Sequence, residues 1–564
     1  MPVRVQRTDG SVGGVVGKMQ ELPTEDESDQ LLSIYCVEDP VTGFRLALMV
    51  AAEQDLQTKD MAAIAKVFTA QGRDASLLPK SEADEDEKAK EKSEALERSA
   101  ESLSETAKRA DLQTASVYGF MTHYSGYDGA EIAFSFVEHY LKKAGYLRSD
   151  TRCVLPLHAC DYASLAQRAL PLPDPLNYEH IFCDMLDRVP AAMDAACSAA
   201  SEKAAAQMRQ TGSQKPTKDQ REIASALGRQ LIQELMDCLR DVNFEEASSF
   251  CLDHKAECPI PLSKKYVDRG MLTIAVAGLD WSCMGSKSGL LGSGIQANVL
   301  WVQERRQMQE HLLFIECTSQ FDEEAAATAH LSDLYAFQSI ILGPDDFGLP
   351  CTRQRKFCVG VLRQWGYMDK PLARVGELLK IRRLCGDVYL QAPDAEVRQH
   401  LADRALERGF QASAGDMLAP SQLLPPAMLI RHDAYKAQKQ KLGSQVGLCM
   451  LGQNAESFGH MSETVPALLR SSTVWCFGSQ TEREMMAKEH LLVMGIPAYA
   501  HVADEVGFEN PLQNVLSGPN ALSSAQVKRL AGNSICGPVF GHLLIFVLSC
   551  LHRGDSSVQD DADV

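Results

Sequence analysis

The chain has 564 residues, of which 45% are hydrophobic and 23% charged, the balance of an ordinary globular protein rather than of a fibrous or wholly disordered one. Its formal net charge of −19 argues against a surface coated for phosphate binding, because that affinity comes from Lys and Arg. The acid is concentrated in three tracts with net charges of −5, −5 and −4, namely Glu21–Asp29, Lys80–Glu105 and Asp555–Val564. The rest of the chain therefore carries only about −5 and is nearly balanced.

Cysteine usage and hydropathy predict a soluble intracellular protein. The 17 cysteines are odd in number and scattered, and no apolar secretory signal precedes them, which indicates free thiols in a reducing compartment. The most apolar stretch, Val539–Leu551, is too short to span a bilayer, so we expect a buried helix there and no membrane. Residues 1–110 are predicted to be an acidic, largely disordered extension.

From residue 112 onward, short apolar runs alternate with turns and amphipathic helices, a pattern typical of a parallel α/β sheet. An Ala-rich helical insertion is expected over Ala191–Cys238, broken at Thr211–Thr217. Beyond Val361 the periodicity degrades until a helix is predicted over Thr481–Ala500. The other expected elements, in chain order, are a strand at 115–124, a helix at 130–144, a strand at 153–159, a helix at 162–170, and strands at 180–183, 272–277 and 312–315.

The ends of the first three predicted strands carry a candidate cofactor site. A glycine-containing turn, Ser125–Gly129, follows the first strand, and Asp161 and Asp184 follow the second and third. Glycines let a cofactor approach the backbone, and an acid after the second strand can accept hydrogen bonds from ribose hydroxyls. A generic α/β domain often produces this arrangement, so the turn alone is weakly specific.

Read in order, the strand ends resemble the cytosine-5 DNA methyltransferase family over about residues 112–551. The most specific match is Gly348–Phe357, which is similar to the family's Gly-x-Pro-Gln-x-Arg-x-Arg segment, with Cys351 in place of Gln. Glu316-Cys317-Thr318 corresponds to its Glu-Asn-Val. Three later segments resemble the family's closing motifs: Val465–Ser472, Lys488–Pro497 and Arg529–Val539.

The resemblance implies S-adenosylmethionine as the cofactor. Tyr124-Ser125-Gly126 followed by Gly129 looks like the family's Phe-x-Gly-x-Gly turn, with Asp128 in place of the second glycine. By the same resemblance, Asp161 holds the ribose and Asp184 lies near the adenine amino group. The implied cofactor-binding residues are therefore Tyr124, Ser125, Gly126, Gly129, Asp161, Asp184 and Asn533.

The family's chemistry adds a cysteine thiolate to carbon 6 of a flipped-out cytosine, so that carbon 5 attacks the methyl sulfonium. A carboxyl group at ring nitrogen 3 and an arginine at the carbonyl oxygen stabilise the charge that develops. The resemblance gives the carboxyl role to Glu316. It gives the arginine role, together with fixing of the loop, to Arg353 and Arg355.

The nucleophile is missing from its expected place. The family segment resembles Pro-Cys-x-x-Phe-Ser, and aligning Trp281-Ser282 with Phe-Ser puts Gly278 where the cysteine belongs. Cys283 is the only nearby thiol, on the far side of Trp281-Ser282. Three interpretations remain open: a methyltransferase whose gene sequence lost a few codons, a catalytically silent protein of the same fold, or an enzyme in which Cys283 substitutes after the loop rearranges.

Two further patterns are less specific. Cys251, His254 and Cys258 could begin a zinc site with Cys238 as a fourth ligand, although the spacing matches no strong zinc template and cysteines are commonly just buried, so no metal ligand is assigned. Arg353–Arg383 holds nine basic and two acidic residues with Trp365 and Tyr367 interleaved, and Arg431–Lys441 holds four basic and one acidic. Such stretches suit nucleic acid, or else form a solvated surface of mixed charge.

We therefore expect an α/β fold with a Rossmann-like methyltransferase sheet, helices on both faces and a smaller target-recognition domain. The expected function is S-adenosylmethionine-dependent methylation of cytosine in DNA, in the nucleus. The alternatives are RNA as substrate or a silent nucleic-acid-binding protein. The expected domains are a catalytic domain at 111–360 with its insertion at about 191–250, a target-recognition domain at 361–465, a return to the catalytic domain at 466–551 and an acidic tail at 552–564.

Overall fold

The computed structural model describes most residues between 117 and 554, and before them only three strands, β1 (Val3–Gln6), β2 (Val12–Val16) and β3 (Val37–Glu38). These strands form a small antiparallel sheet inside the extension that was predicted to be largely disordered. Outside the described residues lie 125–128, 144–146, 150–151, 171–176, 211–217, 268–269, 280–288, 293, 376–383, 411–418, 457–458, 460, 479–481 and 509.

A nine-stranded sheet forms the centre of the molecule, in the order β11-β13-β10-β9-β4-β5-β6-β7-β8. The five central strands β10, β9, β4, β5 and β6 are parallel, whereas the pairings of β13 with β10 and β11 and of β7 with β6 and β8 are antiparallel. The bounds are β4 (Tyr118–His123), β5 (Val154–Cys160), β6 (His180–Phe182), β7 (Ser248–Cys251), β8 (Ala256–Pro259), β9 (Leu272–Gly278), β10 (Leu312–Thr318), β11 (Tyr335–Leu342) and β13 (Arg355–Leu362). The expectation of a parallel sheet is thus correct for the centre and wrong for both edges.

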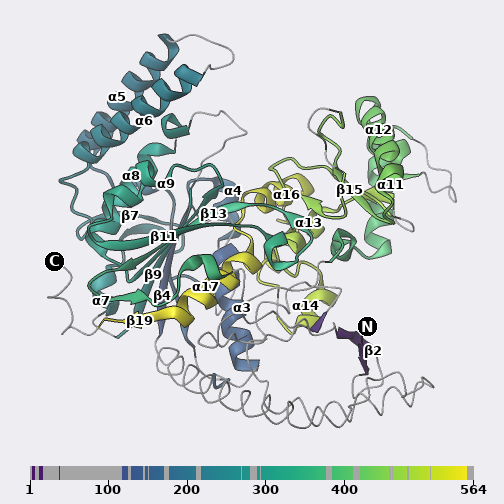
Figure 1. Cartoon of the computed structure of the whole chain (residues 1–564), viewed down its shortest axis with the longest axis horizontal. Coiled ribbons are helices and arrows are strands. Elements are labelled where there is room, and N and C mark those ends of the chain that lie inside the picture. The colour runs from purple at the N-terminus through teal and green to yellow at the C-terminus, as the bar shows by residue number, and fades with distance from the viewer. Residues whose placement is uncertain are drawn as a thin grey trace, which may run out of the picture.

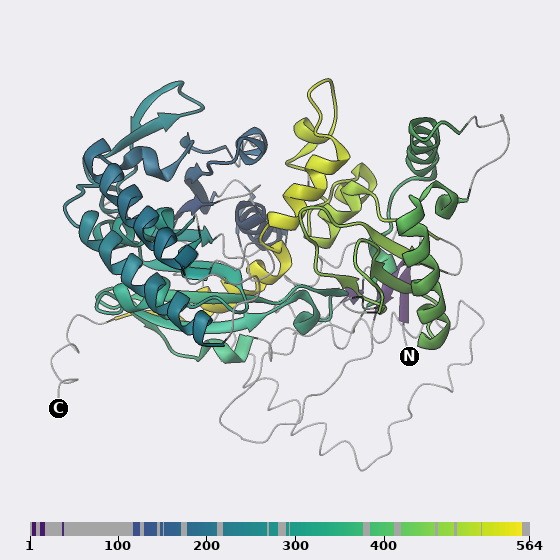
Figure 2. The same ribbon diagram turned by 90° about the horizontal axis from the view of Figure 1, so that it is seen from above.

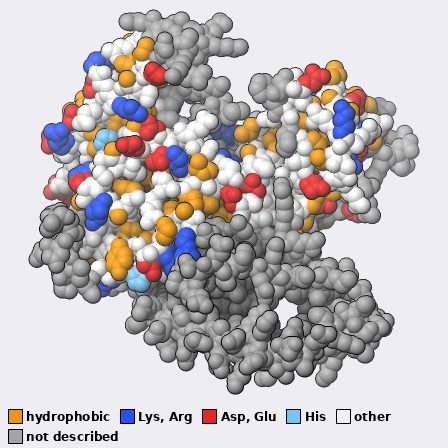
Figure 3. Space-filling model, viewed as in Figure 1, with side chains coloured by type: hydrophobic (Ala, Val, Ile, Leu, Met, Phe, Trp, Pro, Cys, Tyr) orange, Lys and Arg blue, Asp and Glu red, His pale blue; other side chains and the backbone are white. Residues whose placement is uncertain are grey.

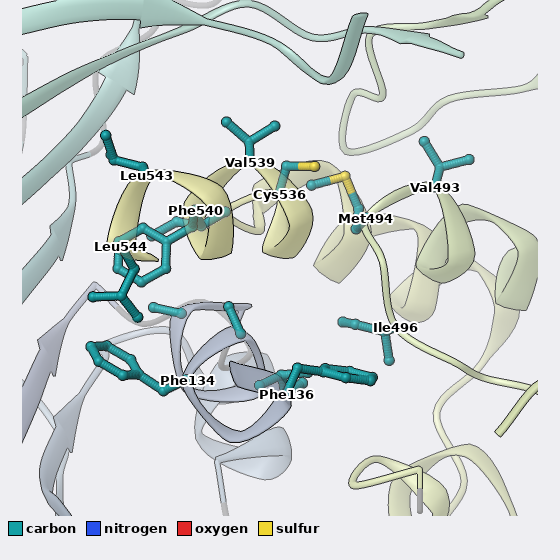
Figure 4. Packing of buried hydrophobic residues seen from close by; sticks show 14 of the residues in the cluster. Phe134, Phe136, Val493, Met494, Ile496, Cys536, Val539, Phe540, Leu543 and Leu544 are labelled. Atoms are coloured by element: carbon teal, nitrogen blue, oxygen red, sulfur yellow. The ribbon is translucent and has the colours of Figure 1, made fainter. Parts of the chain in front are cut away.

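Helices cover both faces of this sheet, which confirms the predicted fold class. Alternate strand residues such as Phe120 and Phe314 pack against α3 (Gly129–Lys143) and α17 (Gly537–Cys550) on one face. Their neighbours pack on the other face against α6 (Lys218–Cys238) and α8 (Ile295–Met308). Figure 4 shows aromatic side chains of α3 and α17 meeting, with the Phe540 ring centroid 5.9 Å from that of Phe134.

Several shorter helices and one helical hairpin complete this layer structure. The hairpin is α5 (Ala191–Gln210) with α6, and it projects from the sheet at the upper left of Figure 1, as the predicted insertion. The residues between its two helices are those of the predicted break. The shorter helices are α4 (Ser164–Ala169), α7 (Ser263–Val267) and α9 (Glu323–Ala326).

A second region lies beside the sheet, at the right of Figures 1 and 2. It has its own core around Tyr435 and Trp475. Its elements are α11 (Asp394–Glu407), α12 (Pro426–Leu442) and a small sheet of β15 (Gly447–Met450), β17 (Val474–Phe477) and β18 (Glu482–Glu484). This small sheet crosses the boundary expected at residue 465, and the assignment of the region to target recognition stays a prediction.

The helix predicted over Thr481–Ala500 is wrong in extent. The structure has β18, then α13 (Ala487–Val493), and α14 (Ala500–Val506) begins only at the end of the predicted span. Gly495 adopts φ 90°, and Pro497 follows, so the chain cannot continue as a helix between α13 and α14.

The C-terminal part returns to the sheet. After α15 (Gln513–Leu516) and α16 (Ser524–Asn533), α17 lies buried beside α3, and β19 (Leu551–Arg553) pairs with β14 (Gly366–Met368). Two further short strands, β12 (Cys351–Thr352) and β16 (Val465–Pro466), pair in parallel. Among the described residues, the stretch Ser524–Cys550 is long and apolar enough to cross a membrane, but 78% of its apolar window is buried in the fold, as expected of core helices.

Candidate functional site

The carboxyl ends of the five parallel strands form one continuous row. The strand pairing places His123 opposite both Cys160 and Ala277, and places Glu316 opposite Gly278. From β4 the chain continues to β5 and β6 on one side of the sheet and then crosses to β9 and β10 on the other side of β4. The direction in which strands are added therefore reverses between β4 and β9. In open α/β sheets, ligands bind in the crevice outside the strand ends at such a switch point.

Tyr124 ends β4 at this switch point, in the left-handed region with φ 56°. This conformation is uncommon for a residue with a side chain and marks a sharp change of chain direction. Its buried hydroxyl makes no hydrogen bond within the described part of the chain, and burial raises the pKa of Tyr124 well above its ordinary value. Ser125, Gly126 and Asp128, predicted to continue the cofactor turn, lie outside the described residues.

Gly129 begins α3, directly beneath the closing segment of the chain. A Cβ atom at Gly129 would lie 2.5 Å from the carbonyl oxygen of Ile535 and 2.6 Å from Oγ of Ser534. A glycine is therefore required here by the close approach of that segment. The predicted contact of Gly129 with a cofactor stays a prediction.

Asp161 and Asp184 follow the neighbouring strands β5 and β6. Oδ1 of buried Asp161 accepts a hydrogen bond from the backbone N–H of Ala163 at 2.7 Å. Oδ1 of Asp184 accepts one from the N–H of Leu186 at 3.0 Å. These local bonds fix both carboxylates at the strand ends, where the predicted ribose and adenine contacts would lie.

Glu316 lies near the end of β10, with its side chain buried. Its Oε1 is 3.1 Å from Nε of Arg355 on the adjacent strand β13, yet it has no aligned hydrogen bond among the described residues. Burial raises the pKa of Glu316 above its ordinary value, although the guanidinium groups of Arg355 and Arg353 oppose the rise. A carboxyl group in such a place can carry a proton and donate a hydrogen bond.

Arg353 is buried, and its guanidinium binds backbone groups of the protein. Its guanidinium donates hydrogen bonds to the carbonyl oxygens of Leu468 at 2.9 Å, Gly532 at 3.2 Å and Ser534 at 2.9 Å. Burial lowers the pKa of Arg353 to about 10, which leaves the group charged near neutral pH. The two arginines that the sequence grouped together therefore differ: Arg355 faces Glu316, and Arg353 positions the closing segments.

These closing segments also contact each other directly. Oδ1 of Asn533, a predicted cofactor-binding residue, accepts a hydrogen bond from Nε of Arg470 at 2.8 Å. A Cβ at Gly532 would lie 2.5 Å from the carbonyl carbon of Leu469, so this glycine permits the approach. The sequence could not indicate these contacts, because they join positions about 60 residues apart in the chain.

The described thiols near Glu316 are poor nucleophiles. Cys317, Cys351 and Cys536 are all buried. Sγ of Cys317 contacts the carbonyl oxygen of Leu279 at 3.4 Å, and burial raises the pKa of Cys536 to about 11 and that of Cys351 further. A thiol of that pKa is almost entirely protonated near neutral pH. Cys283, the doubtful candidate nucleophile, lies outside the described residues, in the loop after β9.

The described residues of the basic segment that begins at Arg353 are divided between the two ends of strand β13. Besides Arg353 and Arg355, Lys356 turns inward and pairs with Glu323 at 2.6 Å. Trp365 and Tyr367 lie beyond the other end of the eight-residue strand β13, about 26 Å away at 3.3 Å per residue. The interpretation that this basic stretch and its aromatic residues contact nucleic acid stays a prediction.

The aromatic residues of that segment have partners of their own. The Tyr367 ring stacks on His552 with centroids 5.5 Å apart, and the Trp365 ring lies 4.9 Å from that of His311. In the second predicted basic stretch, Arg431 donates to the Gly452 carbonyl oxygen at 2.8 Å. On the face shown in Figure 3, basic and acidic side chains of the described residues are interspersed.

The candidate zinc ligands do come together, but with a different fourth member. Ligand atoms of Cys251, His254 and Cys258 lie close to one another and to His180. Cys238 instead lies beside Cys197 in the α5–α6 hairpin. The sequence could not indicate His180, because this residue precedes the other ligands by about 70 positions.

No known family profile matches the chain, and no curated protein matches it. Similar solved structures include the Schizosaccharomyces pombe Dnmt2 methyltransferase, at 12% identity and a TM-score of 0.37, covering 76% of this chain and 97% of that one. The Entamoeba histolytica methyltransferase EhMeth has 11% identity and a TM-score of 0.37, covering 76% of this chain and 98% of its own. An Escherichia coli prophage protein described as a DNA modification methyltransferase has 10% identity and a TM-score of 0.37, covering 77% and 99%.

All three are methyltransferases by name. At these identities and TM-scores they do not assign the chain to a family.

Proposed function

We propose that the chain is an S-adenosylmethionine-dependent methyltransferase that acts on carbon 5 of cytosine in DNA, and hence in the nucleus. One observation carries the proposal. A buried carboxyl group with a raised pKa, Glu316, stands beside Arg355 at the strand end next to the switch point of the sheet. The motif that supplies Arg355 also supplies Arg353, which brings the closing segments to the same edge.

The residues at the strand ends fit S-adenosylmethionine. Tyr124 turns the chain sharply at the end of β4 and leaves a buried hydroxyl without a described partner, and two acids follow the next strands. Asp161 would accept hydrogen bonds from the ribose hydroxyls, and Asp184 would face the adenine amino group. When bound, this cofactor supplies an electrophilic methyl group.

Glu316 and Arg355 would hold the cytosine ring. The protonated carboxyl of Glu316 would donate a hydrogen bond to ring nitrogen 3, and the Arg355 guanidinium would bind the carbonyl oxygen. The nucleophile would come from the loop after β9, which contains Cys283 and begins beside Gly278, opposite Glu316. Base flipping is required, because carbon 6 is inaccessible within the helix.

Cofactor binding is the first test. Isothermal titration of the full-length protein with S-adenosylmethionine is expected to show one site per chain. Asp161→Asn should weaken binding about tenfold or more, because a charged hydrogen bond is worth about 1.5–3 kcal/mol. Asp241→Asn, at an exposed turn after α6, is the matched control and should bind as the unaltered protein does. A protein that folds but does not bind the cofactor would contradict the proposal.

Covalent trapping tests the chemistry. A duplex containing 5-fluorocytosine should form a denaturation-resistant complex in the presence of the cofactor, and Cys283→Ser and Glu316→Gln should abolish it. The same experiment with an RNA hairpin distinguishes an RNA substrate from DNA.

A catalytically silent nucleic-acid-binding protein is the second candidate. It is favoured by Gly278 at the place of the expected cysteine and by the protonated state of the described thiols near Glu316. Intact cofactor binding with no trapping on either nucleic acid would support this candidate. Resequencing the transcript across Ala277–Trp281 tests whether codons for a cysteine were lost.

A further inference from the structure

The hairpin of β7 and β8 places two cysteines on one face of the sheet edge. Residue pairing sets Cys251 opposite Ala256 and Ser249 opposite Cys258. Because side chains alternate along a strand, Cys251 and Cys258 are diagonal neighbours on the same face. His254 lies in the turn between the strands and is exposed, and Lys255 beside it adopts φ 54°, which lets the turn close tightly.

The adjacent strand β6 adds a histidine to this face. Phe182 pairs with Cys251, and the N–H of Leu252 donates to the Ile181 carbonyl oxygen at 2.7 Å, so the hairpin is bonded to β6. His180 is two residues before Phe182 and shares its face, with the two rings stacked at 5.4 Å. The His180 ring centroid lies 5.0 Å from that of His254.

The four ligand atoms lie close enough to one another to surround a single ion. One atom from each of His180, Cys251, His254 and Cys258 lies within 4.8 Å of all the others. For zinc bonds of about 2.3 Å to sulfur and about 2.0–2.1 Å to nitrogen, a tetrahedron has sulfur–nitrogen edges of about 3.6 Å. Sγ of Cys258 and Nδ1 of His254 are 3.5 Å apart. The other pairs need to close by no more than about 1.5 Å, a change within reach of side-chain rotation.

A second observation points to a ligand at this place. Nδ1 of His180 is buried and has no hydrogen-bond partner among the described residues. Buried polar atoms are nearly always bonded in native proteins, so one beside two thiols and another imidazole needs a partner that the described residues do not supply.

We propose that His180, Cys251, His254 and Cys258 bind one Zn²⁺ ion. Two thiolates and two neutral imidazoles are the donors that zinc prefers, and four protein ligands leave no open position for a substrate, which makes the site structural rather than catalytic. Binding releases the two thiol protons to solvent, so the charges of the two thiolates balance that of the ion.

The site would fasten the hairpin at the sheet edge to β6. Strand β6, which carries His180, ends at Phe182, two residues before Asp184. A metal bound to His180 would therefore also help to fix the position of Asp184. This inference concerns the metal alone and does not depend on the proposed methyl transfer.

The test is zinc content by mass spectrometry on the full-length protein, purified without a polyhistidine tag, stripped with a chelator and reloaded with ZnCl₂. One zinc per chain is expected. His254→Ala should lower zinc affinity at least tenfold in a chelator competition, and because His254 is exposed in a turn, circular dichroism should show an unchanged fold. His180→Ala and Cys258→Ser should also lose zinc.

The matched controls are His501→Ala, at an exposed histidine, and Cys238→Ser, at the thiol beside Cys197. Both should retain one zinc per chain. Substitution with Co²⁺ should give the visible absorption of a tetrahedral cobalt thiolate, which is lost in Cys258→Ser. The proposal is overturned if the reloaded protein holds no zinc, or if His180→Ala retains zinc while Cys238→Ser loses it. A disulfide between Cys251 and Cys258 in protein purified with a reducing agent would also overturn it.

Discussion

Two buried glutamates, each beside two arginines, have pKa values that are shifted in opposite directions. Glu304 on α8 is fully buried, and its Oε2 accepts a hydrogen bond from Arg188 at 2.5 Å while Oε1 contacts Arg305 and lies 3.5 Å from His123. Burial alone would raise the pKa of Glu304, but Arg188 and Arg305 outweigh it and hold that pKa well below its ordinary value. Glu316 has one long contact to Arg355 and a raised pKa.

The difference separates a structural ion pair from a candidate catalytic acid. Glu304 has partners on both oxygens, and its network holds β4, α8 and the segment after β6 together. Glu316 stands at a strand end with an oxygen whose bonding is incomplete. Perturbed carboxyl groups that lack a full set of protein partners are the ones expected at functional sites.

The largest expected effect is on the Glu304 network. Glu304→Gln should lower the free energy of unfolding by about 3–5 kcal/mol, because Arg188 would be left buried without its carboxylate and Arg305 would keep only Glu310. Urea denaturation measures this. Glu234→Gln, which breaks the surface pair with Lys203, is the control and should cost less than about 1 kcal/mol. Equal losses of stability in Glu304→Gln and Glu234→Gln would show that the buried network contributes no more than a surface ion pair.

Arg353→Ala should have the next largest effect on stability. It leaves the carbonyl oxygens of Leu468, Gly532 and Ser534 without their donor, at a cost of about 3 kcal/mol. Hydrogen exchange should accelerate around residues 465–472 and 530–536 and stay unchanged in the α5–α6 hairpin. Arg355→Ala should not produce this pattern, and if it does, the two arginines do not have separate roles.

Two buried histidines next to Glu304, His123 and His158, should make the stability of the protein depend on pH. Burial lowers the pKa of His123 to about 3 and holds that of His158 well below the ordinary value of about 6.5 found in the unfolded chain. The folded state therefore binds fewer protons, so this stability is present above pH 6.5 and is lost as pH falls toward 3. The loss should approach about 1.4 kcal/mol per pH unit for each histidine.

Denaturation midpoints between pH 7 and 5 measure this slope. A variant with His123→Gln and His158→Gln should show a flatter profile, whereas His501→Ala, at an exposed position, should keep the slope of the unaltered protein. Parallel profiles for the double variant and the unaltered protein would show that these two histidines do not cause the dependence.

The smallest effect on stability should come from Glu316→Gln. The folded pKa of Glu316 lies above the unfolded value, so its favourable contribution exists at low pH and is lost as pH rises through the folded pKa. At pH 7.5 the substitution should leave the free energy of unfolding, measured by urea denaturation, unchanged or raise it by up to about 1 kcal/mol, the reverse of Glu304→Gln. A loss of more than 2 kcal/mol would make Glu316 a structural residue as well.

Much of the central fold could be predicted because its strands are buried on both faces. The run Leu312–Ile315 is continuously apolar and Leu272–Ala277 is interrupted only by Thr273, and the α5–α6 hairpin follows from its alanines and the polar break. The edge strands were missed because a strand such as Tyr335–Leu342 has many half-exposed residues, which weakens the hydrophobic signal.

The candidate site was predictable by position along the chain but not by contact. Strand-end acids can be found from the pattern, because every parallel strand delivers its end to the same edge. The partners of Arg353 are 115 to 181 residues away, and no local pattern indicates them. The same reason explains the choice of Cys238 over His180 as a neighbour of Cys251: nearness in sequence was the only guide.

The return of α17 to the sheet has a consequence for the order of events during synthesis. Glu316, Arg353 and the strand ends are all made well before Gly532, Ser534 and α17, which complete their surroundings. While the ribosome adds the intervening residues, the apolar surface of α3 lacks the cover that Phe540 later gives to Phe134. The surroundings of the strand ends can therefore be completed only late in synthesis, and apolar surface exposed until then favours aggregation of the nascent chain.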